Sequence, residues 1–246
     1  MLKLQKVCKN FGGLTATADV SFTVPQGEIT ALVGPNGSGK TTLFNLISGV
    51  YAPDRGEIHL DGRPIHGLKP HQVCHLGIGR TYQVVQPFAG MTVLENVMVG
   101  ALYGRAGAKR NLGTARTQAF AVLERVGLVA AAAQSASSLT LSGKKRLEVA
   151  KALATDPRLL LLDEVMAGLS PAGVDEMVAV VRGLHEQGLT IILVEHVLRA
   201  VMKLAQRTIV LHMGAVIAQG EPAVVMRDRR VVESYLGEEY ASALHR

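Results

Sequence analysis

One stretch near the start of the chain limits its fold more than any other feature. It matches the pattern G-x-x-x-x-G-K-[ST] at every fixed position, and its residues are Gly34, Pro35, Asn36, Gly37, Ser38, Gly39, Lys40, Thr41 and Thr42. An apolar run, residues 29–33, precedes it, and a helix-like segment, residues 43–48, follows it. In this strand–loop–helix context the pattern predicts a loop whose backbone N–H groups surround phosphate oxygens.

The predicted phosphate loop gives a role to each fixed side chain. Glycines let the backbone curl so that successive N–H groups converge, and the N-terminus of the following helix adds positive potential. We expect Lys40 to reach the terminal phosphates and the Thr41 hydroxyl to ligate Mg²⁺. The sequence therefore predicts a site for a nucleoside triphosphate.

Composition and charge limit the class of protein further. Of the 246 residues, 48% are hydrophobic, which is enough for a substantial core. No apolar run approaches the ~18 residues of a membrane span, and residues 1–6 resemble the start of a strand rather than a signal peptide. Cys8 and Cys74 lack the spacing of a metal site, which is typical of a reduced cytosolic interior. The net charge of +6 is scattered, which favours a solvated surface over a nucleic-acid patch.

The pattern of apolar residues predicts strands first and helices afterwards. Residues 2–7 and 18–24 are predicted strands, and a turn at 25–27 leads into the apolar run before the phosphate loop. From Met91 onward the pattern becomes helical. The helical part is expected to begin with a capping box at Thr92 and Glu95 and to continue with a basic loop at 104–113, a helix at 114–126 and a helix from about Ser142.

The last part of the chain returns to alternating strands and helices. Residues 159–162 and 190–194 are fully apolar runs, typical of parallel strands covered on both faces. A helix is predicted between them at 173–187. The second run is expected to be followed by a helix that includes the apolar residues Leu198, Val201 and Met202, and then by a hairpin at 208–211 and 215–219.

Two carboxylates follow the first of these buried strands. At the carboxyl end of a parallel strand, Asp163 is expected to lie close to the phosphate loop and to hold the Mg²⁺ shell. Glu164, one residue farther, is placed to polarise an attacking water molecule.

Together these features resemble the nucleotide-binding domain of ABC transporters over nearly the whole chain. The resemblance implies an α/β fold of the P-loop NTPase type, with a RecA-like core, an antiparallel β subdomain and an inserted helical lobe. The expected organisation is a single domain over residues 1–246, with the α/β core at 1–87 and 151–221, the helical lobe at approximately 88–150 and a short C-terminal helical tail at 222–246.

The resemblance also implies roles for residues outside the phosphate loop. Phe11 matches the position of an aromatic residue that stacks on adenine. Gln83 matches the glutamine between the two lobes that contacts the metal and water. His196, which follows the strand-like residues 191–195, matches the switch histidine that contacts the γ-phosphate.

The signature segment departs from the family's L-S-G-G-Q. Residues 141–145 match only its first three letters, which would give Ser142 and Gly143 the family's roles. The family's serine, however, lies about two residues farther upstream of the strand-end Asp than Ser142 does, which favours Thr140 as the hydroxyl. Both registers remain open, and in either one a hydroxyl and free N–H groups suit the γ-phosphate held by a partner subunit.

Further residues resemble one subgroup, the ATPase subunits of branched-chain (hydrophobic) amino acid importers. Residues 167–171, Ala-Gly-Leu-Ser-Pro, are similar to its A-G-[ML]-[NS]-P pattern, although Val165 replaces the usual proline and Ser170 the usual Asp. The resemblance implies an ATPase that powers import through separate membrane permeases. Urea or amides, aromatic compounds and lipopolysaccharide remain alternative cargoes. An ABC ATPase acting on nucleic acid is less favoured, because the chain has no heptad or zinc-type insertion.

The implied assembly has several components. Two ATPase chains, identical or different, would enclose two ATP molecules with Mg²⁺, each phosphate loop facing the partner's signature segment. In this assembly Glu164 would polarise water, while Lys40 and His196 would stabilise charge on the γ-phosphoryl group. A periplasmic substrate-binding protein would take part indirectly, and the chain would lie on the cytoplasmic face of the inner membrane.

Overall fold

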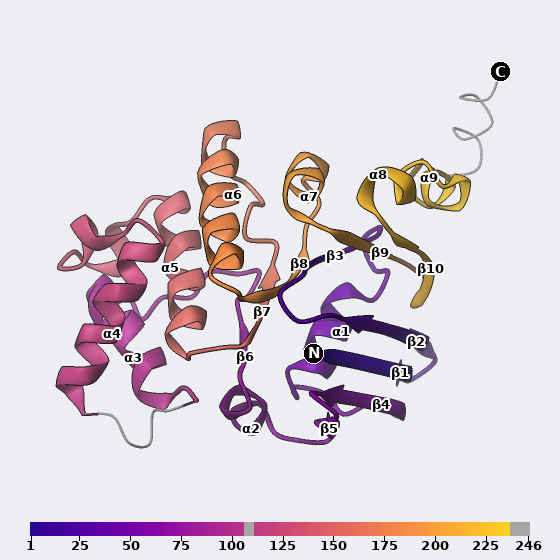
Figure 1. Cartoon of the computed structure of the whole chain (residues 1–246), viewed down its shortest axis with the longest axis horizontal. Coiled ribbons are helices and arrows are strands. Elements are labelled where there is room, and N and C mark those ends of the chain that lie inside the picture. The colour runs from indigo at the N-terminus through magenta and orange to yellow at the C-terminus, as the bar shows by residue number, and fades with distance from the viewer. Residues whose placement is uncertain (106–110, 237–246) are drawn as a thin grey trace. The chain divides into compact units, whose positions relative to one another are not determined.

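The computed structural model describes residues 1–105 and 111–236, and the chain divides into two compact units (Figure 1). The first unit contains residues 1–70 and the chain from Val201 onward, and the second contains residues 71–200. Part of the predicted loop at 104–113 and part of the predicted tail, residues 237–246, lie outside the described residues. No helix within the described ranges is long and apolar enough to cross a membrane.

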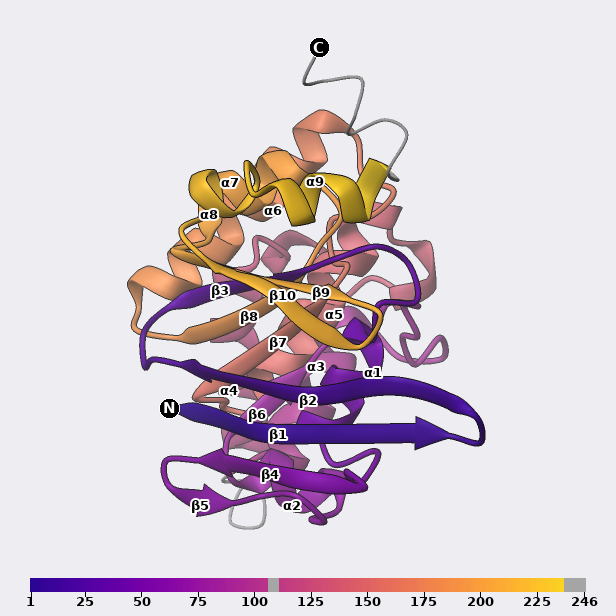
Figure 2. The same cartoon turned by 90° about the vertical axis from the view of Figure 1, so that its right-hand side faces the viewer.

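The first unit contains an antiparallel sheet in the order β2-β1-β4-β5, whose longer strands lie side by side in Figure 2. Its strands are β1 (Leu2–Phe11), β2 (Leu14–Val24), β4 (Arg55–Leu60) and β5 (Arg63–Pro64). The predicted strands at 2–7 and 18–24 were too short. Lys6 and Asp19 have positive φ angles, and register shifts interrupt the alternation that the sequence pattern depends on.

A second group of strands in this unit carries the phosphate loop. The parallel pair consists of β3 (Ile29–Val33) and β9 (Arg207–His212), and β10 (Ala215–Gly220) joins β9 in the predicted hairpin. All five residues of β3 are buried, and α1 (Lys40–Ile47) follows the loop. The described chain ends with α8 (Pro222–Val225) and α9 (Arg229–Leu236).

The second unit contains three parallel strands in the order β8-β7-β6. They are β6 (Ile78–Arg80), β7 (Leu159–Asp163) and β8 (Thr190–Val194). Every residue of β7 and β8 is buried, which confirms the prediction of strands covered on both faces. The helix between them, α6 (Pro171–Glu186), is capped by Ser170, whose side chain accepts a hydrogen bond from Gly173 N.

Helices α3 (Val93–Tyr103), α4 (Leu112–Arg125) and α5 (Leu141–Ala154) pack on one another in the second unit. The predicted capping box at the start of α3 is confirmed, since Thr92 and Glu95 exchange hydrogen bonds. The helix predicted from about Thr114 is present as α4 and begins two residues earlier. The Asn111 side chain accepts a hydrogen bond from Thr114 N, so the helix begins at Leu112.

Shorter elements complete the chain. They are α2 (Pro70–His75), α7 (Leu198–Leu204) and two 3₁₀ turns, Val129–Ala131 and Ala136–Ser138. The predicted helix after β8 is present as α7, in which Val201 is buried whereas Leu198 and Met202 are exposed. The helix also buries Ala200 and Leu204, because those two residues share a face with Val201.

Candidate functional site

The phosphate loop between β3 and α1 has a backbone that only glycine can adopt at two places. Gly34 and Gly39 have φ angles of +151° and +104°. A Cβ atom at Gly34 would collide with the carbonyl oxygen of Leu211, and one at Gly39 would collide with that of Ala16. The loop is therefore closely packed against β9 and β2, and the pattern of glycines in the sequence follows from this packing.

Lys40 lies across this loop rather than in solvent. Its side chain is 6% exposed, and its Nζ donates hydrogen bonds to the carbonyl oxygens of Gly34 and Pro35, both at 2.7 Å. Nζ is also 3.4 Å from Ser38 Oγ. The ammonium group is thus held over the loop, where an entering phosphate oxygen can replace backbone carbonyls as its acceptor. Thr41 lies in the first turn of α1 and is exposed.

The predicted adenine-stacking residue lies at the end of β1 and has an aromatic neighbour. Phe11 is 41% exposed, and its ring centroid is 5.2 Å from that of Tyr51 in an edge-on arrangement. Lys9 Nζ lies 5.6 Å from the same Phe11 centroid. Sequence reasoning did not identify Tyr51, which follows α1 in a segment with no periodic pattern. The pair forms an exposed aromatic platform in the unit that carries the phosphate loop.

In the second unit, two predicted site residues from separate segments, Gln83 and His196, contact the carboxylate of a third, Glu164. Glu164 follows β7 with a φ of +51°. Its Oε2 accepts a hydrogen bond from Gln83 Nε2 at 2.7 Å, and its Oε1 is 2.9 Å from His196 Nε2. A carboxylate held between an amide donor and an imidazole can orient and polarise a water molecule.

Asp163 is held more deeply, at the end of β7. It is 2% exposed, and its Oδ2 accepts a hydrogen bond from Arg80 Nη2 at 3.2 Å. Within the described residues its Oδ1 has no hydrogen-bond partner. Burial raises the pKa of Asp163 above its ordinary value, and the charge of Arg80 opposes this rise. A buried, partly unsatisfied carboxylate is a suitable ligand for a divalent cation.

Glu195, immediately before His196, is a further buried carboxylic acid that the sequence did not single out. It is 1% exposed, and its Oε1 accepts a hydrogen bond from Met166 N at 2.9 Å. Burial raises the pKa of Glu195 to about 7, although the hydrogen bond from Met166 lowers it. This side chain therefore connects the segment after Glu164 with the segment that carries His196.

The signature segment forms the start of α5. Thr140 is the N-cap, exposed to solvent, and its hydroxyl accepts a hydrogen bond from Gly143 N at 3.2 Å. Ser142 lies in the first turn and is half-buried, and Gly143 is buried. Both candidate hydroxyls thus lie at a helix N-terminus, where unpaired N–H groups favour an anion.

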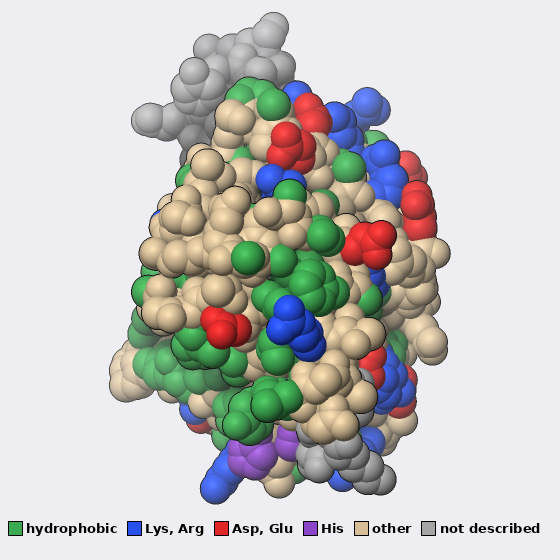
Figure 3. Space-filling model, turned by 90° about the vertical axis from the view of Figure 1, so that its left-hand side faces the viewer, with side chains coloured by type: hydrophobic (Ala, Val, Ile, Leu, Met, Phe, Trp, Pro, Cys, Tyr) green, Lys and Arg blue, Asp and Glu red, His purple; other side chains and the backbone are tan. Residues whose placement is uncertain are grey.

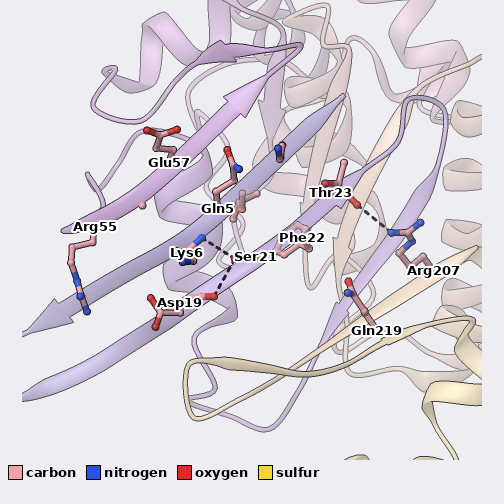
Figure 4. A pocket seen from close by; sticks show the side chains of 13 residues that line it. Gln5, Lys6, Asp19, Ser21, Phe22, Thr23, Arg55, Glu57, Arg207 and Gln219 are labelled. Atoms are coloured by element: carbon pink, nitrogen blue, oxygen red, sulfur yellow. Dashed lines mark hydrogen bonds between the residues drawn. The ribbon is translucent and has the colours of Figure 1, made fainter.

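A cavity of about 780 Å³ lies elsewhere in the first unit, and none of the predicted site residues lines it (Figure 4). The residues that line this cavity come mainly from β1, β2 and β4, and they include Lys3, Gln5 and Glu57. Both basic and acidic residues line it, among them Lys6, Asp19 and Arg55. The cavity is therefore separate from the nucleotide chemistry.

Comparison with known proteins identifies the family of this chain. The ABC transporter family model matches residues 17–167, and the family described as branched-chain amino acid ATP-binding cassette transporter matches residues 215–241. The chain belongs to the ABC transporter family, as an ATP-binding protein.

Individual relatives are similar over nearly their whole length. The chain is 36% identical over 250 residues to the high-affinity branched-chain amino acid transport ATP-binding protein BraF of Pseudomonas aeruginosa, covering 97% of this chain and 98% of BraF. It is 37% identical over 252 residues to LivG of Salmonella typhimurium, a protein of the same description, with the same coverage. A crystal structure of a nucleotide-free ATP-binding cassette of an ABC transporter matches with a TM-score of 0.89 and 32% identity, over 97% of this chain and 99% of that one. The ADP conformation of such a cassette matches with a TM-score of 0.87 and 33% identity, over the same shares of the two chains.

Proposed function

We propose that this chain binds and hydrolyses ATP as a subunit of an importer for branched-chain amino acids, and that hydrolysis powers transport through separate permeases. The observation that carries the proposal is the cluster in which Gln83 and His196 hold the two carboxylate oxygens of Glu164. The cargo is supported by the relatives, which are branched-chain amino acid transport ATP-binding proteins, and by the family that matches residues 215–241.

The phosphate loop would bind the triphosphate through its backbone N–H groups and through Lys40, which would exchange its carbonyl acceptors for phosphate oxygens. The exposed ring of Phe11 would stack on the adenine, with Tyr51 supporting its edge. Glu164 would accept a proton from the attacking water. His196 would donate a hydrogen bond to the γ-phosphoryl group, where negative charge develops.

The residues present suit Mg²⁺, because they offer the hard oxygen ligands that this ion prefers. Asp163 has a buried carboxylate oxygen without a partner among the described residues, and Thr41 has an exposed hydroxyl. We therefore assign Thr41, Gln83 and Asp163 to the metal. When bound, Mg²⁺ would neutralise charge on the β- and γ-phosphates.

Thr140, Ser142 and Gly143 would act on the ATP of a second ATPase subunit, which can be an identical chain or a different one. The position of Thr140 as the N-cap of α5 supports the register in which Thr140 supplies the hydroxyl. Ser142 then takes the place of the second glycine of the family's motif. A composite site of this kind makes hydrolysis dependent on closing of the dimer.

Permease subunits would dock near the segment around and after Gln83. Tyr82, Val84 and Phe88 are exposed there, and exposed apolar side chains are typical of protein contacts. Hydrophobic side chains at the surface of one face are visible in Figure 3. The chain would thus lie at the cytoplasmic face of the inner membrane, and a periplasmic substrate-binding protein would deliver cargo to the permeases.

Phosphate release by the purified chain in Mg²⁺ and ATP tests the catalytic assignment. We expect Glu164→Gln to lower turnover by about 100-fold or more while ATP binding is retained, because only the water-polarising carboxylate is lost. Glu186→Gln, at the exposed end of α6, makes the same chemical change away from the site and should leave turnover unchanged. Wild-type turnover in Glu164→Gln would refute the assignment.

A further inference from the structure

Helix α5 carries three charged side chains at helical spacing on one face. Lys145, Glu148 and Lys151 follow one another at intervals of about one turn. Lys145 is 5% exposed and Glu148 is 4% exposed, although charged side chains are almost never buried unless they are paired. Lys145 and Glu148 therefore need partners, and most of these partners are backbone groups outside the helix.

The first residue of this stripe binds two segments of the proposed catalytic cluster. Lys145 Nζ donates a hydrogen bond to the carbonyl oxygen of Glu164 at 2.8 Å and another to that of Gln83 at 3.3 Å. One buried ammonium group thus joins the backbones of the water-polarising residue and the glutamine that holds its side chain. It does so without touching either functional side chain.

The other two residues bind the far end of the loop that begins at Gln83. Glu148 Oε1 accepts hydrogen bonds from Gln86 N at 3.2 Å and from Lys151 Nζ at 2.7 Å. Lys151 Nζ also donates to the carbonyl oxygen of Gln86 at 2.9 Å. These two side chains therefore fix the loop at Gln86, and among the described residues neither forms a hydrogen bond with Glu164. Within the stripe, the connection to Glu164 depends on Lys145.

Lys145 lies close to the signature residues at the start of α5. The helix begins at Leu141, directly after its cap Thr140, so Lys145 lies little more than one turn from the signature residues. In the proposed dimer those residues face the partner's ATP, whereas Gln83 and Glu164 act on the ATP of their own chain. Because Lys145 is hydrogen-bonded to the backbones of Gln83 and Glu164, a shift of the N-terminus of α5 would move both of these backbones.

We propose that Lys145 is a positioning residue that couples the two nucleotide sites of the dimer. It transmits the engagement of the signature segment with the partner's ATP to the backbones of Gln83 and Glu164 in its own chain. The inference rests on the proposed ATPase function and deepens it, because it makes turnover at one site depend on nucleotide at the other.

Steady-state ATP hydrolysis by the purified full chain, measured over a range of ATP concentrations, tests the coupling. We expect a Hill coefficient between 1 and 2 for the wild type. Lys145→Met keeps the length of the side chain but removes its donors, so the coefficient should fall to about 1 and kcat by about 10-fold, with nucleotide affinity nearly unchanged. Lys145→Arg restores donors and should restore cooperativity, which a purely structural role would not require.

Lys151→Met is the matched control, because it makes the same substitution in the same stripe without a contact to Glu164. It should keep the wild-type Hill coefficient. If Lys145→Met does not fold, Lys145→Gln is measured in its place, and its Hill coefficient should likewise fall to about 1. A Hill coefficient of 1 for the wild type would overturn the coupling while leaving ATP hydrolysis in place. So would a wild-type Hill coefficient in Lys145→Met, or in Lys145→Gln if Lys145→Met does not fold. A wild-type chain without ATPase activity would instead refute the proposed function itself.

Discussion

A buried acid, Glu195, should make a large contribution to the pH dependence of this protein's stability. Its carboxyl is 1% exposed, and burial raises its pKa to about 7 from an ordinary value of 4.5. The nearby charge of Glu164 also raises this pKa, and that of Lys145 lowers it, both by less than burial does. Substituting Gln for Glu195 removes the titrating group but keeps an oxygen that can accept the hydrogen bond from Met166 N.

The magnitude follows from the two pKa values. Between pH 4.5 and 7 the folded state holds a proton on Glu195 that the unfolded chain has lost, so the free energy of unfolding decreases as pH rises. The contribution is complete below pH 4.5 and is lost above pH 7. A difference of about 2.5 between the pKa values corresponds to about 3 kcal/mol.

Urea denaturation of the nucleotide-free chain at pH 5, 6, 7 and 8 measures this effect. The Glu195→Gln variant should gain stability relative to the wild type by about 2.5 kcal/mol as pH rises through this range, because part of the effect lies below pH 5. The exposed control Glu186→Gln should follow the wild type throughout. A difference between Glu195→Gln and the wild type that stays constant with pH would show that the acid is ionised in the folded chain, contrary to this reasoning.

Other substitutions test the remaining assignments. Lys40→Met should weaken ATP binding by about 10- to 100-fold in a fluorescent-nucleotide titration, because charge-assisted hydrogen bonds to phosphate are lost; unchanged affinity would contradict its role. His196→Ala should lower kcat by about 100-fold and change KM much less, whereas an equal effect on both would indicate a binding role instead. Thr140→Ala should lower the free energy of unfolding by about 1 kcal/mol through loss of the α5 cap and should reduce ATPase activity more than Ser142→Ala does. Equal, small losses of activity in these last two variants would contradict both registers of the signature.

Local sequence patterns predicted the elements and residues that depend on local geometry. The buried strands β7 and β8, the capping box of α3 and the hairpin at Gly214 were identified because periodicity, capping or turn residues define them within a few positions. The ends of β1 and β2 were missed where positive φ angles break the alternation. The sequence pattern did not define the buried face of α7, because its apolar residues occupy both sides of the helix.

The residues of the candidate site likewise differ in whether the sequence could identify them. Asp163 and Glu164 lie at and directly after the end of a buried strand, so their place could be predicted from the local pattern, whereas His196 was identified through the family resemblance. Lys145 and Glu195 could not be predicted, because their partners, such as Gln83 and Met166, come from distant segments whose packing no local pattern specifies. That a charged side chain is buried can be recognised only when the fold is known.

The central claim is that hydrolysis by this chain powers the import of branched-chain amino acids. Uptake of radiolabelled leucine by cells whose only copy of this protein carries Glu164→Gln, compared with cells that carry Glu186→Gln, tests it most directly. Uptake should be lost in the first strain and normal in the second, with equal amounts of the protein in both. Normal leucine uptake in the Glu164→Gln strain would contradict the claim, and loss of urea, aromatic-compound or lipopolysaccharide transport alone would assign the ATPase to that cargo instead.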